Sequence, residues 1–236
     1  MVEQFPATRH SAIEAGRSVD EATRRLGYER VAKTYWRPVL AYLRLRHRLA
    51  PADAEDVTQQ ILEQLWSRQL LAQFQPHRVR FRTYLRSCVD NLVANRRRDA
   101  AAAKRGGGWV AIEEDISQLE RALDAEELPS DPDPETLFER EWTRMVFEEA
   151  MRALREDYVT RGRTLDIQIF EEYDLDGRDQ LTYLDLAARH GLTTSAVTNR
   201  LASVRRDLRI KVLTTLASLT ATDEEYRAEA ERILGR

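Results

Sequence analysis

The sequence contains a single cysteine, Cys88, and only four histidines, at positions 10, 47, 77 and 190. One cysteine excludes an internal disulfide bond, and the wide spacing of the histidines fits no familiar set of metal ligands. Cys88 stands at helical spacing from Leu85 and Leu92, which favours a buried residue over a nucleophile. We therefore expect no metal, no cofactor and no catalytic residue.

Long apolar runs are also missing. No stretch approaches the roughly 18 apolar residues that a membrane helix requires. The N-terminus lacks the basic and then apolar order of a signal peptide. These two features predict a cytoplasmic protein that has no membrane partner.

Strand-like alternation of apolar and polar residues is absent, and nearly every periodic segment has the helical period. The sequence predicts an all-α fold of two helical domains joined by an acidic linker, the second containing a helix-turn-helix. Three glycines at 106–108 and prolines at 129, 132 and 134 mark the linker. The expected boundaries are 1–105, 106–134 for the flexible linker, 135–219, and 220–236 for a C-terminal helix.

Three helices are expected in the first domain. The first covers Leu26–Arg46, where Pro38 either begins a new helix or kinks this one. The second begins at Pro51 and carries the apolar stripe of Ala54, Val57, Ile61 and Leu65. A loop around position 76 leads to the third, which covers about 81–104.

Charge is segregated along the chain, although the formal net charge is only −3. Residues 78–105 contain nine Lys and Arg against two acids, whereas residues 113–141 contain twelve acids against two arginines. This asymmetry indicates a surface that binds a polyanion, next to an acidic connector that is solvated or masks that surface.

The segment from Leu181 to Leu208 is predicted to be a helix-turn-helix. Thr182 and Asp185 form a capping box, and Gly191 permits the left-handed turn that ends a short helix. Thr193 caps the second helix. The residues expected to face inward are Leu181, Leu184, Ala187 and Ala188 on the first helix, and Val197, Leu201, Val204 and Leu208 on the second.

Polar side chains on the second helix are able to contact bases and phosphates of DNA. A plain helical hairpin remains an alternative for these residues. The predicted DNA contacts of this helix are Thr194, Ser195, Thr198, Asn199, Arg200, Ser203, Arg205 and Arg206.

The long helix of the first domain mixes arginines with aromatic and amide side chains. This combination suits single-stranded nucleic acid, because arginines neutralise phosphates while aromatic faces hold unstacked bases. The alternative is a solvated basic face with Phe81 and Tyr84 buried. The predicted DNA contacts here are Arg78, Arg80, Arg82, Tyr84, Arg86, Asn91, Asn95, Arg96, Arg97 and Arg98.

Taken together, these segments resemble the extracytoplasmic-function sigma factors of bacterial RNA polymerase, in the sigma-70 superfamily. The resemblance covers nearly the whole chain. It rests on YWRPV at 35–39 and ADAEDVTQ at 52–59, which look like the polymerase-binding region two. RFRTYL at 80–85 and NLVANRRR at 91–98 look like the promoter-melting helix. Region four is matched by LAARHGLT at 186–193 within the segment 183–206.

The resemblance implies a sigma factor that is not an enzyme and whose partners are core RNA polymerase and promoter DNA. The β′ clamp helices would bind an acidic helix, and the β flap would be a second contact. The 69–80 loop and the helix after it would capture the melted strand of the minus-ten element, and region four would read the duplex minus-thirty-five element. The residues implied for polymerase binding are Asp53, Glu55, Asp56, Gln59, Gln60, Leu62, Glu63 and Trp66.

A further helix is predicted after a cap at Thr222, and minimal members of this family end sooner. It either packs on one of the domains and modulates access, or it completes the core of region four. A DNA-binding regulator that never touches polymerase is the main rival function. A nuclease that uses Asp174, Asp176 and Asp185 is a weaker one. Restraint by an anti-sigma protein, by phosphorylation or by the chain's own linker and C-terminal helix stays open.

Overall fold

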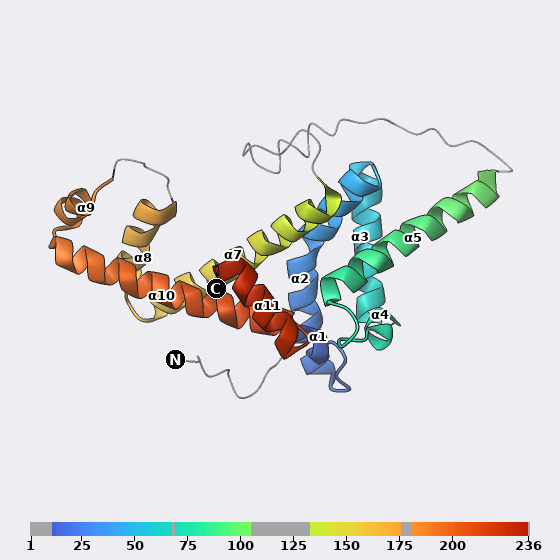
Figure 1. The fold of residues 1–236 in the computed structure, drawn as a ribbon, viewed down its shortest axis with the longest axis horizontal. Coiled ribbons are helices and arrows are strands. Elements are labelled where there is room, and N and C mark those ends of the chain that lie inside the picture. The colour runs from blue at the N-terminus through green and yellow to red at the C-terminus, as the bar shows by residue number, and fades with distance from the viewer. Residues whose placement is uncertain (1–10, 68, 105–132, 176–180, 236) are drawn as a thin grey trace. The chain divides into compact units, whose positions relative to one another are not determined.

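The structure is a computed structural model that describes residues 11–67, 69–104, 133–175 and 181–235. Within these residues it is all helical, which confirms the predicted fold class (Figure 1). The predicted linker lies almost wholly outside the described residues. The elements are α1 (Ala12–Ala15), α2 (Glu21–Arg46), α3 (Pro51–Trp66), α4 (Gln69–Gln73), α5 (Phe81–Lys104), α7 (Pro134–Thr160), α8 (Thr164–Phe170), η1 (Glu171–Leu175), α9 (Tyr183–His190), α10 (Thr194–Leu219) and α11 (Asp223–Leu234).

The helices of the first part follow the sequence pattern closely. A single helix, α2, runs through Pro38, so this proline does not begin a new helix. Pro51 occupies the first turn of α3, where its missing N–H costs no hydrogen bond. α5 has the bounds that the sequence predicted, and the loop before it contains the short helix α4.

Glycine permits α1 to lie directly against α2. A Cβ atom added at Gly27 would meet the carbonyl oxygen of Ala12 and the amide nitrogen of Gly16, each at 2.6 Å. Both are backbone atoms, which have little room to move. Gly27 therefore fixes the close approach of α1, whose Ile13 is fully buried.

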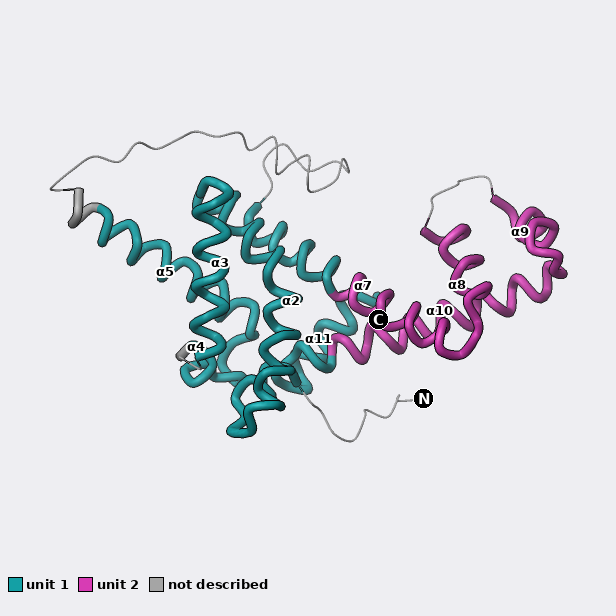
Figure 2. Tube along the Cα trace, turned by 180° about the vertical axis from the view of Figure 1, so that it is seen from behind, with its two compact units in different colours: residues 1–145, 217–236 teal, residues 146–216 magenta. Residues whose placement is uncertain are grey.

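The chain divides into two compact units, residues 1–145 with 217–236 and residues 146–216 (Figure 2). These units differ from the expected boundaries, because the first turns of α7 and the whole of α11 group with the first part of the chain. Two α7 residues explain the grouping. Leu137 belongs to a buried cluster with Ala41 of α2, and the Phe138 ring lies edge-on to Tyr42 at 5.9 Å. The domain assignment itself remains a prediction.

The unit formed by residues 146–216 is held together by an apolar core and by local caps. As predicted, Thr182 and Asp185 form a capping box, and Gly191 adopts φ 65° and ψ 34° in the left-handed region. Thr193 Oγ1 accepts a hydrogen bond from the Ala196 amide at 3.1 Å, as a cap does. The core residues from α7, α8, α9 and α10 include Leu154, Tyr158, Ile169, Phe170, Leu186, Val197, Leu201 and Val204.

The predicted inward face of α9 was wrong in part. Leu184 is 68% exposed, whereas Leu186 is fully buried. The capping box begins the helix at Tyr183, and the residues that turn inward are 183, 186, 187 and 190, at the spacing of one helical face. Leu181 is partly buried against the core, and Ala188 is exposed.

The predicted C-terminal helix exists, and Thr222 Oγ1 accepts a hydrogen bond from the Glu225 amide at 3.1 Å. None of the described helices has an apolar stretch long enough to span a membrane. The described residues contain no group of three or more potential metal ligands.

Candidate functional site

The acidic face of α3 follows from how this helix is buried. Ala54, Val57, Ile61 and Leu65 turn toward the core, so the opposite face is left to polar residues. Of the residues predicted to bind polymerase, Leu62 alone lies in the core, and Asp53 and Gln60 are half-buried. The exposed members are Glu55, Asp56, Gln59, Glu63 and Trp66.

Trp66 lies at the C-terminal end of this face, beside an aromatic and a basic residue of α2. Its ring lies edge-on to Tyr28 of α2 at 5.0 Å, and the Arg24 guanidinium is 5.2 Å from its centroid. The Trp66 side chain is nevertheless 36% exposed. The α3 face therefore combines carboxylates with one exposed indole, a composition suited to a basic protein partner.

The second half of α5 presents its predicted DNA contacts to solvent. Arg96 donates to Gln60 Oε1 at 3.0 Å, Arg97 donates to the His47 carbonyl at 2.9 Å, and Arg98 donates to Asn95 Oδ1. These contacts orient the guanidinium groups without neutralising them, because none of the three acceptors is charged. The exposed residues of this stretch are Asn91, Asn95, Arg96, Arg97 and Arg98.

The start of α5 is arranged differently. Tyr84 is half-buried, and its hydroxyl donates to the Leu70 carbonyl at 2.7 Å while its ring packs 5.2 Å from Phe74. Burial raises the pKa of Tyr84. Phe81 is fully buried, so the alternative in which these two aromatics serve the core agrees with their positions. Arg78 is exposed in the preceding loop.

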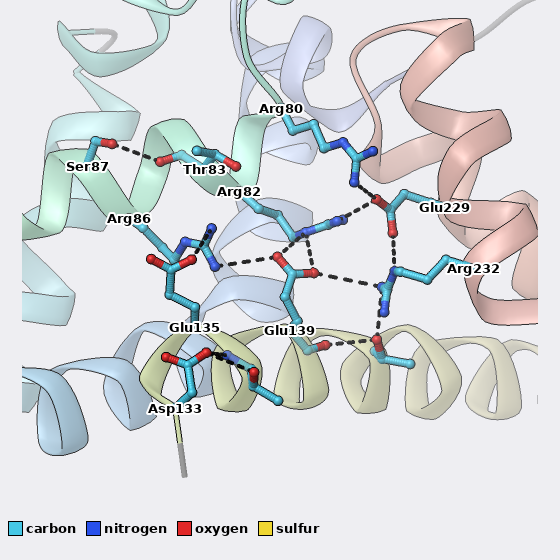
Figure 3. Close-up of polar contacts among 12 residues, drawn as sticks. Arg80, Arg82, Thr83, Arg86, Ser87, Asp133, Glu135, Glu139, Glu229 and Arg232 are labelled. Carbon is cyan, nitrogen blue, oxygen red and sulfur yellow. Dashed lines mark hydrogen bonds and ion pairs between the residues drawn. The ribbon is translucent and has the colours of Figure 1, made fainter.

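The remaining arginines of this end pair with carboxylates from α7 and α11 (Figure 3). One oxygen of Glu229, Oε1, accepts hydrogen bonds from Arg80 Nη1 at 2.9 Å and from Arg82 Nη2 at 2.6 Å. Arg82 Nε lies 3.0 Å from Glu139 Oε2. Arg86 lies 3.5 Å from Glu135 and 3.7 Å from Glu139. We call these six residues, with Arg232, the arginine–glutamate cluster.

The central ion pair of this cluster is buried. Arg82 and Glu229 have side chains 2% and 0% exposed, and the Arg82 guanidinium lies 3.8 Å from the centroid of the Trp142 ring. Arg232 of α11 donates to the second oxygen of Glu229 at 2.9 Å and to Thr143 Oγ1 at 3.1 Å. Because a buried charge without a partner is costly, Arg82 and Glu229 depend on each other and on the more exposed members around them.

Two glutamates of α11 have pKa values shifted in opposite directions. Burial alone would raise the pKa of Glu229, but the charges and hydrogen bonds of Arg82 and Arg232 outweigh it and lower that pKa. Burial raises the pKa of Glu225, only partly offset by hydrogen bonds from the Ala221 and Phe81 amides and by the charge of Arg82. Glu229 is therefore held as an anion, whereas the charged form of Glu225 is disfavoured.

The second predicted DNA-binding helix, α10, also mixes exposed and paired residues. Arg200 forms an ion pair with the buried Asp166 of α8, and Arg205 lies 2.8 Å from Asp174 of η1. Ser203 is half-buried and accepts a hydrogen bond from Arg163 at 3.4 Å. Besides Arg205, the exposed predicted contacts are Thr194, Ser195, Thr198, Asn199 and Arg206.

The glutamates of the cluster were missed by reasoning from sequence. Glu229 stands at helical spacing between Tyr226 and Ile233, on the apolar stripe of α11. Arg82 stands in the same way on the stripe of Leu85 and Val89. A charged residue inside an apolar stripe predicts a buried partner, and that signal was available.

Residues 32–103 match the family model described as Sigma-70 region 2. The searches of the curated proteins and of the solved structures gave no match. The matched residues include the whole of α3, α4 and the cluster's arginines from α5. Sigma-70 family members are transcription initiation factors that bind RNA polymerase and are not enzymes. The likeness to the sigma-70 family is therefore shown for the segment 32–103, which is similar to region 2 of that family.

Proposed function

We propose that the chain is an alternative sigma factor of the extracytoplasmic-function group, which directs core RNA polymerase to a particular set of promoters. One observation carries the proposal. The segment that matches Sigma-70 region 2 exposes an acidic face on α3 and three consecutive arginines near the end of α5. The first fits a basic protein surface, and the second fits a nucleic-acid backbone.

Polymerase binding is proposed to use the acidic face of α3 against the β′ clamp helices. Glu55, Asp56 and Glu63 supply charge that steers association, and the exposed indole of Trp66 supplies apolar area. Leu62 would act indirectly, by packing α3 onto the core. The β flap is proposed as a second polymerase contact.

Capture of the melted minus-ten strand is proposed for the 69–80 segment and the exposed residues of α5. Arg96, Arg97 and Arg98 neutralise phosphates, while Asn91 and Asn95 are able to hydrogen-bond to unpaired bases. Binding of extruded bases and phosphates supplies the free energy of melting, so no nucleotide hydrolysis is required.

Recognition of the duplex minus-thirty-five element is proposed for α9 and α10. The hydroxyl and amide groups of Thr194, Ser195 and Asn199 are exposed at the start of α10, where a reading helix contacts base edges. Arg206 is exposed for a phosphate contact. With Arg200 and Arg205 paired to acids, this helix should bind DNA weakly without polymerase.

Run-off transcription with purified core polymerase and a randomised promoter library tests the proposal. The unchanged chain should select a defined pair of promoter elements. Asp56→Arg should reduce capture of core polymerase at least tenfold, because it reverses a charge in the centre of the α3 face. Glu148→Arg makes the same reversal on α7 and serves as the matched control.

Two results would overturn the proposal. Folded protein that neither binds core polymerase nor supports transcription would instead favour a DNA-binding regulator, provided that it still binds duplex DNA. Equal capture of polymerase by Asp56→Arg and by the unchanged chain would remove α3 from the interface. Control by a separate anti-sigma protein remains a prediction from the resemblance.

A further inference from the structure

The arginine–glutamate cluster joins parts of the chain that are far apart in sequence. Arg82 and Glu229 are separated by 147 residues, and Glu139 comes from a third helix, α7. Figure 3 shows the guanidinium groups of Arg80 and Arg82 pointing toward the same carboxylate of α11. The first turn of α5, within the segment that matches Sigma-70 region 2, is thus covered by residues outside that segment.

The contact between α11 and α5 extends beyond this ion pair. Glu225, one turn before Glu229, lies close to the start of α5, because the charge of Arg82 and the Phe81 amide both lower its pKa against the effect of burial. Its Oε2 also accepts from the Ala221 amide at 2.8 Å. Carboxylates are favoured at the start of a helix, where the backbone amides have no partners within the helix. Of these two glutamates, Glu229 is the one held as an anion, and it lies where an anionic ligand of Arg80 and Arg82 would bind.

Carboxylate and phosphate present similar oxygen geometry to a guanidinium group. Glu229 Oε1 bridges two arginines at 2.9 and 2.6 Å, as an oxygen of a nucleic-acid backbone is able to do. The cluster contains four arginines, at 80, 82, 86 and 232, against three glutamates, at 135, 139 and 229. Carboxylates of the chain thus already occupy the places beside these arginines that phosphates of a ligand would take.

We propose that α11 is an internal competitor of single-stranded DNA, with the Glu229 carboxylate holding Arg80 and Arg82 in place of backbone phosphates. The inference rests on the proposed function, since it assumes that α5 binds the melted strand. Arg80 is already 49% exposed and exchanges its partner first. Arg82 becomes available only when α11 moves away, so strand binding and displacement of α11 are coupled.

A purely structural role for the cluster makes a different prediction. If Glu229 only holds three helices together, its loss weakens the fold without strengthening DNA binding. If Glu229 is a competitor, its loss releases two arginines for phosphate contacts. For single strands each contact adds about 0.7 to the slope of log K against log salt concentration, so two contacts add about 1.4.

The test measures binding of a labelled single-stranded oligonucleotide to the full chain by fluorescence anisotropy at several salt concentrations. Glu229→Gln should bind about tenfold more tightly at 0.1 M salt, with a slope steeper by about 1.4. Glu231→Gln removes the same charge from an exposed position on the same helix and should change neither value appreciably. Arg80→Ala should reduce the slope more in the Glu229→Gln background than in the unchanged chain.

Hydrogen exchange of the unchanged chain keeps the test decisive if Glu229→Gln does not fold. Addition of the oligonucleotide should reduce the protection of the α11 amides while α2 and α3 stay protected. Unaltered α11 protection in the DNA complex would overturn the inference, as would equal slopes for Glu229→Gln and Glu231→Gln. If run-off transcription succeeds in that case, the proposed function stands without the competitor.

Discussion

The arginines at the two ends of α5 carry the same charge but have opposite surroundings. Near the start, Arg82 is 2% exposed between carboxylates and the Trp142 ring. Near the end, Arg96, Arg97 and Arg98 are exposed and hydrogen-bond to uncharged groups. In the first arrangement the charge is already paired within the protein, whereas the second leaves charge for a ligand. Arginines that look alike in the sequence of one helix thus differ in whether their charge is paired within the protein or exposed to solvent.

Arg82→Ala should give the largest effect in this comparison. The substitution leaves Glu229 buried without its closest partner, and loss of one member of a buried ion pair costs about 3–5 kcal/mol. Urea denaturation measures the free energy of unfolding. Arg97→Ala, at an exposed position, should change that free energy by no more than about 0.5 kcal/mol. Equal losses for the two variants would contradict the comparison.

Replacing Arg96, Arg97 and Arg98 together by alanine should affect DNA binding much more than stability. The free energy of unfolding should change little, because the three side chains are exposed. Binding of single-stranded DNA should lose about 2 from its salt slope, since three phosphate contacts disappear. Anisotropy titrations at three salt concentrations give the slope. An unchanged slope would mean that this end of α5 does not meet the backbone.

The pH dependence of stability should distinguish Glu225 from Glu229, because their pKa values are shifted in opposite directions. The pKa of Glu225 is raised in the folded state, so its contribution to stability is lost as pH rises through that value. Glu225→Gln should therefore stabilise the protein at pH 8, by on the order of 1 kcal/mol, because the amide oxygen still accepts from Ala221. Urea midpoints at pH 4 and pH 8 measure the gain, which should be absent at pH 4.

Glu229 should respond to pH in the opposite direction. Its pKa is lowered in the folded state, so its contribution is present above its ordinary value of 4.5 and is lost as pH falls through the lowered one. Glu229→Gln should therefore make the free energy of unfolding depend less on pH in the acid range. For the other glutamate, a loss of stability in Glu225→Gln at pH 8 would show that the charged form of Glu225 is favoured in the folded protein.

Arg205→Ala should give the smallest effect. Arg205 and Asp174 are 42% and 25% exposed, and exposed ion pairs contribute about 0.2–1 kcal/mol. The loss should lie within that range in urea denaturation. A loss as large as that of Arg82→Ala would show that burial does not distinguish the two pairs.

Much of the fold could be predicted because its determinants lie close together in sequence. Thr182 caps α9 by accepting a hydrogen bond from the Asp185 amide, only three residues away. Gly191 adopts the left-handed conformation that glycine takes without strain. Pro51 begins α3 because its fixed φ suits the first turn of a helix. The acidic face of α3 follows from one apolar stripe. These features require no knowledge of what packs against the segment.

The candidate site could be predicted only in part, because its decisive contacts are distant in sequence. Arg82 was expected to bind DNA from its basic surroundings, and its contact with Glu229 depends on where α11 packs. The exposure of Leu184 likewise depends on which face α9 turns to α10. Local patterns identify a charged or apolar residue but not the partner that tertiary structure supplies.

The contact between Trp142 and Arg82 gives the cluster an optical reporter of its own. The indole is fully buried, and a charged group lies 3.8 Å from its centroid. Replacing the other three tryptophans, at positions 36, 66 and 109, by phenylalanine would leave Trp142 as the sole source of indole emission. Entry of water as α11 leaves would shift that emission to longer wavelength, so stopped-flow mixing with an oligonucleotide would time the opening directly.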